Sequence, residues 1–88
     1  MLTWKLRVLM AEKGISGKEL AKWSGLSEIS VSRLRSTDTI KQIAAKTLNG
    51  LCTGLTLAYR ARGEKKIITP GDLFEFEFKQ NETNKTNH

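Results

Sequence analysis

Apolar residues recur at helical spacing through the first 55 residues and fall into four segments. We expect helices over residues 3–13, 17–24 and 28–35, and a fourth that begins near Ile43. Polar, turn-prone residues at 36–39 separate the third segment from the fourth. Residues that commonly begin or end helices stand at the other borders, namely Gly14, Ser16, Gly25 and Ser27. The pattern therefore predicts short helices joined by tight turns.

After Leu55 the apolar pattern fits two structures. Leu55, Leu57, Tyr59 and Ala61 alternate with other residues as in a strand, but Leu51, Leu55 and Ala58 also fit one helix that continues from the fourth segment. We favour the continued helix, because Gly63 follows it as a helix end commonly requires.

The C-terminal part begins with a helix-start signal. Thr69 to Asp72 reads as a cap with Pro70 in the first turn, which predicts a short fifth helix through Leu73 and Phe74. Phenylalanines then alternate with glutamates over 74–78, as in a short strand. Residues 79–88 lack apolar side chains and are expected to form a polar disordered tail. We therefore predict one all-α domain over residues 1–78, a compact bundle of about five helices that allows for a short C-terminal strand.

The net positive charge of the chain indicates a negatively charged partner. The 88-residue chain has a net charge of +6, and residues 1–63 hold eleven Lys and Arg against four acids, whereas residues 64–88 hold four against five. An excess of base suggests a polyanion such as nucleic acid or an anionic membrane surface. No run approaches the roughly 20 apolar residues that a membrane span needs.

Candidate catalytic chemistry is sparse. The single histidine is His88 in the polar tail, and the single cysteine, Cys52, lies within the apolar pattern, where we expect a buried structural thiol. The chain has neither metal-ligand spacing nor a phosphate-binding glycine loop, so we expect no enzyme and no cofactor or metal. A lone cysteine and a charged N-terminus agree with a cytoplasmic location without export.

Residues 17–36 carry a local motif. Two helices that cross through a tight turn need a small residue in the first helix and, four positions later, a residue that tolerates a left-handed conformation. Ala21 and Gly25 meet these requirements. Apolar anchors stand around them at Leu20, Leu26, Val31 and Leu34. The spacing predicts a helix-turn-helix.

These residues resemble the Cro/C1-type (XRE-like) helix-turn-helix family of phage and bacterial repressors. The resemblance lies in Lys18–Ala21, Ser24–Ser27 and Ile29–Leu34, covers residues 4–55 and returns at 70–76. It implies a λ-repressor-like fold and a transcriptional regulator, with repression favoured, that binds double-stranded DNA. The fourteen residues between Leu55 and Pro70 exceed the few expected in compact members.

The resemblance also implies that residues 28–35 form the recognition helix in the major groove. Candidate base-reading residues are Ser27, Glu28, Ile29, Ser32 and Arg33, and candidate phosphate contacts are Lys18, Arg35 and Lys41. Some of these have a second interpretation: Ser27 as a cap, Glu28 as a partner of the helix dipole, and Ile29 as a core residue. Gly17 stands where the family often has a glutamine that contacts phosphate.

Two questions of assembly follow. We expect a homodimer, with residues 73–78 or Trp23 as its contact, because one small domain reads few base pairs. The alternative function is a protein-interaction module, antitoxin-like, with weak DNA binding. We expect a second basic cluster at Arg60, Arg62, Lys65 and Lys66 to be a solvated face.

Overall fold

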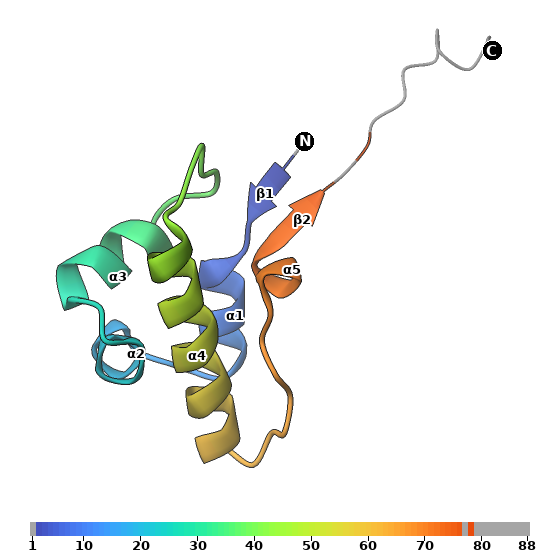
Figure 1. Cartoon of the computed structure of the whole chain (residues 1–88). Coiled ribbons are helices and arrows are strands. Elements are labelled where there is room, and N and C mark those ends of the chain that lie inside the picture. The colour runs from blue at the N-terminus through green and yellow to red at the C-terminus, as the bar shows by residue number, and fades with distance from the viewer. Residues whose placement is uncertain (1, 77, 79–88) are drawn as a thin grey trace, which may run out of the picture.

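The computed structural model of the chain describes residues 2–76 and residue 78. Figure 1 shows the shorter helices packed around one long helix, with a short two-stranded ribbon at one end. The elements are β1 (Leu2–Trp4), α1 (Leu6–Glu12), α2 (Gly17–Ser24), α3 (Glu28–Arg35), α4 (Ala45–Ala61), α5 (Pro70–Leu73) and β2 (Phe74–Phe76). The predicted bundle of five helices with a short C-terminal strand is confirmed. The predicted tail at 79–88 lies outside the described residues.

Serine caps start α2 and α3 at the expected places. The Ser16 hydroxyl accepts a hydrogen bond from the Glu19 amide (3.0 Å), and the Ser27 hydroxyl accepts one from the Ser30 amide (3.1 Å). Gly25 ends α2 with a φ of 79°, a conformation that glycine adopts without steric cost. The boundaries of both motif helices therefore follow from their local sequence.

Helix α4 continues for 17 residues, from Ala45 to Ala61, which confirms the continued helix over the strand alternative. It begins slightly after the expected position near Ile43. In Figure 1 it runs between α2 and α3 on one side and α1 and α5 on the other. Its contact with α2 is close, because a Cβ atom on Gly54 would lie only 2.9 Å from the Ser24 Cβ atom.

The N-terminal boundary of the first helix was predicted wrongly. Residues 2–4 form strand β1 instead of helix, and β1 pairs antiparallel with β2 in the register Leu2 to Phe76 and Trp4 to Phe74. The Trp4 ring contacts the Phe74 ring at a centroid distance of 4.9 Å, and its indole N–H donates to the Leu34 carbonyl at 2.9 Å. These contacts bury Trp4 and accompany the extended backbone of residues 2–4.

One core lies inside the helices and under the ribbon. It contains Leu6, Met10, Leu20, Val31, Leu51, Leu55, Ile68 and Leu73 among its fully buried side chains. The Tyr59 hydroxyl donates to the Leu9 carbonyl at 2.8 Å and joins α4 to α1. Desolvation by burial raises the pKa of Tyr59 to about 12. Cys52 is half-buried, not fully buried as expected, and desolvation raises the pKa of its thiol as well.

The segment between α4 and α5 folds back over α4. Ile68 is buried, and its amide donates to the Thr56 hydroxyl at 2.9 Å. At the start of α5 the Asp72 carboxylate accepts from the Thr69 amide at 2.9 Å, as the predicted cap requires. The residues between α4 and α5 therefore bring the chain back to the end of the domain where β2 pairs with β1. None of the helices in the described part of the chain is both long and apolar enough to cross a membrane.

Candidate nucleic-acid interface

Helix α3 has one anchored side and one exposed side. Val31 is completely buried and Leu34 is half-buried against the core. The opposite side presents the exposed residues Glu28, Ile29, Ser32 and Arg33, which line a shallow depression. Ile29 is 71% exposed, so the alternative that it belongs to the core is wrong. This side has the mixture of charged, hydroxyl and aliphatic groups that reads base edges.

The turn between α2 and α3 fixes how this face is presented. The Gly25 amide donates to the Ala21 carbonyl at 3.1 Å, and the Leu26 amide donates to the Ser24 hydroxyl at 3.2 Å. Leu20 is fully buried and Ala21 is nearly so, which lets the two helices approach closely. The residues predicted to form the helix-turn-helix scaffold are therefore brought together.

Ser27 and Glu28 lie at the start of α3. The Ser27 hydroxyl is engaged by the Ser30 amide and lies 3.0 Å from the Ser30 hydroxyl, so its capping role is confirmed. Glu28 is exposed in the first turn, where a carboxylate stabilises the positive end of the helix. Its position also allows contact with a base, so both interpretations of Glu28 stay open.

Two of the three candidate phosphate contacts flank the first turn of α2. Lys18 is exposed within that turn. Arg35, at the end of α3, reaches back to it: a Cβ atom on Gly17 would lie 3.9 Å from the Arg35 Nη1 atom. Gly17 and the Arg35 guanidinium are therefore neighbours, and a Cβ atom at position 17 would meet the guanidinium at an ordinary van der Waals distance. Lys41 is exposed in the segment between α3 and α4.

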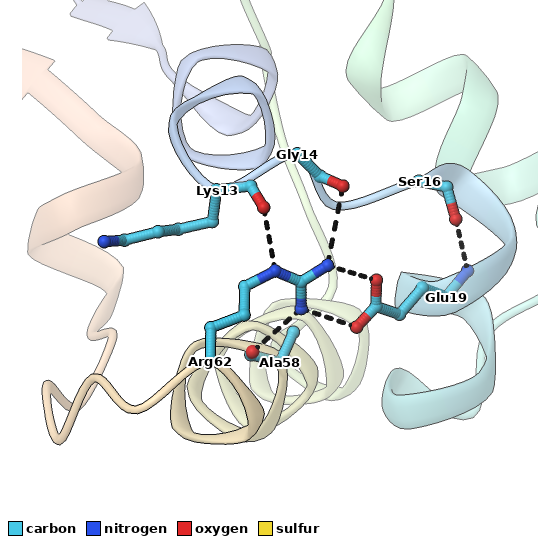
Figure 2. A network of polar contacts seen from close by, with 6 residues as sticks. All are labelled: Lys13, Gly14, Ser16, Glu19, Ala58 and Arg62. Carbon is cyan, nitrogen blue, oxygen red and sulfur yellow. Dashed lines mark hydrogen bonds and ion pairs between the residues drawn. The ribbon is translucent and has the colours of Figure 1, made fainter.

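Arg62 is exposed, as expected of a solvated face, but its guanidinium also makes contacts that the sequence did not predict. It follows α4 directly, and its guanidinium forms a bidentate ion pair with Glu19 in the first turn of α2, with N–O distances of 2.6 and 2.7 Å (Figure 2). The hydrogen bond from Arg62 lowers the pKa of Glu19. Arg60, Lys65 and Lys66 are exposed as expected. The Lys66 Nζ atom also forms an ion pair with the Asp72 carboxylate at 3.9 Å. Local sequence gave no signal for the pair, because its members are 43 residues apart.

Trp23 lies on the outer side of α2, as its offset from Leu20 predicted, and is 36% exposed. The Lys22 ammonium lies 5.5 Å from the centroid of its ring. Both line a groove that also includes Lys18 and Leu26. The groove meets the exposed side of α3 at Glu28, which lines both the groove and the depression on α3.

Comparison with known families supplies an independent finding. The model of the Cro/C1-type HTH DNA-binding domain matches residues 5–57, which is more than half of the chain. Comparison with curated proteins and with solved structures gives no significant match. The matched part contains the helix-turn-helix and all eight candidate DNA contacts, and it ends within α4 before Arg62. The chain belongs to the family of Cro/C1-type helix-turn-helix DNA-binding domains.

Proposed function

We propose that this protein is a cytoplasmic transcriptional regulator, a repressor in preference to an activator, that reads a specific double-stranded DNA sequence with α3. The observation that carries the proposal is the exposed side of α3, where Ile29 is 71% exposed although the same helix is anchored by a fully buried Val31. A large aliphatic side chain held in water by a rigid helix is available to a partner surface. The charged and hydroxyl neighbours of Ile29 favour the major groove as that surface.

Each exposed α3 residue has a chemical role there. The Arg33 guanidinium donates two hydrogen bonds to O6 and N7 of guanine, the commonest specific contact. Ile29 packs against a thymine methyl group, and Ser32 is small enough to permit close approach of the helix. Lys18, Arg35 and Lys41 hold phosphates and set the register of the helix.

Two arginine variants test this assignment. Arg33→Ala should weaken binding to a selected duplex by about 10- to 150-fold, while binding to an unselected duplex changes much less. Arg35→Ala should weaken both alike and reduce the slope of log K against log salt by about one. Fluorescence anisotropy over a salt series measures both quantities.

Arg60→Ala is the matched control, because Arg60 is exposed in the last turn of α4, away from the proposed contacts. The alternative function, an antitoxin-like interaction module, predicts weak binding without sequence preference. In that case Arg33→Ala would behave like Arg60→Ala on every duplex, and the assignment of α3 would be withdrawn.

We further propose that the β1–β2 ribbon joins two copies of the chain. Leu2 and Phe76 are direct cross-strand partners and are 46% and 68% exposed, and Phe78 beyond them is 70% exposed. By strand alternation Leu2 and Phe76 continue the face on which Trp4 and Phe74 pack. The outer edge of β1 is occupied at Trp4, whose amide donates to the Asp38 carbonyl at 2.8 Å, and the outer edge of β2 is occupied at Phe74, whose amide donates to the Pro70 carbonyl. Pairing of β2 with a second copy would therefore begin at Phe76.

A second copy fits this edge, because one strand pairs with itself antiparallel about a two-fold axis. To read symmetric half-sites, such a dimer would need to present its two α3 helices about 34 Å apart. Phe76→Ser should therefore shift a dimer to monomer in sedimentation equilibrium and weaken binding to a symmetric duplex. Val8→Ser is the control, since Val8 is equally apolar and 46% exposed but lies on α1.

Trp23 is the alternative dimer contact, and Trp23→Ala separates the two surfaces. Loss of the dimer in Trp23→Ala but not in Phe76→Ser would move the interface to α2. A wild-type protein that stays monomeric at high micromolar concentration, with and without DNA, would remove the dimer altogether.

A further inference from the structure

The Arg62 guanidinium connects three helices at one point (Figure 2). Its Nε atom donates to the Lys13 carbonyl at 2.8 Å, and Nη2 lies 3.4 Å from the Gly14 carbonyl, both just after α1. Nη1 donates to the Ala58 carbonyl in α4 at 3.0 Å. The Glu19 carboxylate accepts from both Nη atoms at 2.6 and 2.7 Å. These five contacts match the five N–H groups of a guanidinium.

This arrangement constrains the start of α2. The chain turns from α1 into α2 between Gly14 and Ser16, and Arg62 holds the residues on both sides of that turn. The planar fork of arginine fits the carboxylate and the two carbonyls together, which a lysine ammonium does not reproduce. The pair therefore fixes the direction of the first turn of α2 relative to α1 and α4.

The pair also controls charge at this turn. Glu19 follows Lys18, the proposed phosphate contact, and comes two residues after Gly17, which the Arg35 guanidinium approaches. If Lys18 holds a phosphate as proposed, a free carboxylate on the neighbouring residue would repel that phosphate. With Arg62 bound to it, Glu19 contributes no net charge there.

We infer that Arg62 is a positioning residue for DNA binding: it orients the first turn of α2 and cancels the charge of Glu19, without touching DNA itself. The inference rests on the proposed function. It concerns a residue outside the part of the chain matched to the family, which ends at residue 57. The C-terminal half of α4 would then serve to place Arg62, the residue that follows it, beside α2, in addition to packing in the core.

Four variants test the inference against a random-sequence labelled duplex and a duplex recovered by selection. Arg62→Gln removes the charge and the fork, and Arg60→Gln removes the same charge two residues earlier. Glu19→Gln removes the carboxylate, and the double variant Glu19→Gln/Arg62→Gln removes both partners. Circular dichroism and urea unfolding establish first that each variant is folded at the temperature of the binding assay.

Arg62→Gln should weaken binding to both duplexes about tenfold, the effect of one uncompensated charge and a displaced contact, whereas Arg60→Gln should change it less than about twofold. Glu19→Gln alone should weaken binding less than Arg62→Gln does, because Arg62 keeps its contacts to the Lys13, Gly14 and Ala58 carbonyls and no unpaired carboxylate is left. The double variant should recover several-fold of the loss, because the unpaired carboxylate is gone; a role confined to stability would give no recovery.

If Arg62→Gln does not fold, Arg62→Lys replaces it in the binding assay. The expected loss of DNA affinity is then smaller, and the double variant Glu19→Gln/Arg62→Lys should again recover part of it. Equal affinities of Arg62→Gln and Arg60→Gln, or a double variant that binds no better than Arg62→Gln, would overturn the inference alone. Wild-type protein that binds neither duplex would overturn the proposed function and this inference with it.

Discussion

Gly54 shows how a single residue sets the distance between two helices. It lies in α4 opposite α2, where a Cβ atom would come within 2.9 Å of the Ser24 Cβ atom and 3.0 Å of a Leu20 methyl carbon. Because one of these neighbours is close to the α2 backbone, the contact cannot be relieved by rotating a side chain. Gly54 thus lets α4 support the scaffold helix of the DNA-binding motif.

Gly54→Ala should lower the free energy of unfolding by about 1 to 3 kcal/mol, although alanine favours a helix more than glycine does. Urea unfolding followed by circular dichroism measures the change. Gly71→Ala is the control, because its nearest contact would be the Thr69 hydroxyl at 3.6 Å. A Gly54→Ala protein as stable as the control would show that the two helices are not tightly apposed.

Residue roles that depend on near neighbours in the sequence could be predicted, whereas roles that depend on distant elements could not. Ser16, Gly25 and Ser27 were predicted correctly, because a cap or a left-handed turn acts within three or four residues. Arg62 was missed, since its acceptors come from three separate elements. The exposure of Ile29 also required the structure, because helical spacing alone allowed either face.

At the scale of elements, the corner between α1, α2 and α4 depends on protonation. The folded state lowers the pKa of Glu19 below its ordinary value of 4.5, chiefly through the hydrogen bond from Arg62. The unfolded chain therefore binds a proton at a higher pH than the folded protein does. The stabilisation from this group is complete above pH 4.5 and is lost as the pH falls through the lowered folded value.

Wild-type protein should accordingly lose stability below pH 4.5 more steeply than Glu19→Gln, and the difference between the two should shrink as the pH falls. Arg62→Gln should flatten the profile in the same direction, because it removes the cause of the pKa shift. Urea midpoints measured at a series of pH values give the comparison. Parallel profiles for all three proteins would mean that the pair is not formed in solution.

Among the elements, strand β1 was predicted wrongly, because the sequence pattern indicated a helix from residue 3. Leu2 to Trp4 continues the helical spacing of Val8 and Ala11, so a local pattern extends the first helix to residue 3. The strand forms because its partner, β2, comes from the other end of the domain. Helix α4 was predicted correctly, since its apolar repeat is long enough to outweigh the short alternating run within it.

At the scale of the whole molecule, the basic residues fall into two groups. Lys5, Arg7, Lys13, Arg62 and Lys66 form ion pairs within the domain. Among the residues that the structure describes, the proposed DNA contacts Lys18, Arg33, Arg35 and Lys41 form none, and Lys22, Lys46, Arg60 and Lys65 form none either. The net charge predicted a polyanionic partner, but only the structure separates cations that stabilise the fold from those available to a partner.

We propose that the exposed side of α3 reads a particular DNA sequence, and selection of bound duplexes from a random pool is the test of this role. Wild-type protein should enrich a two-fold symmetric motif with half-sites about one helical turn apart. Arg33→Ala, selected in parallel, should lose the preference at one position of each half-site. A wild-type pool that shows no enrichment over the starting pool would contradict the account.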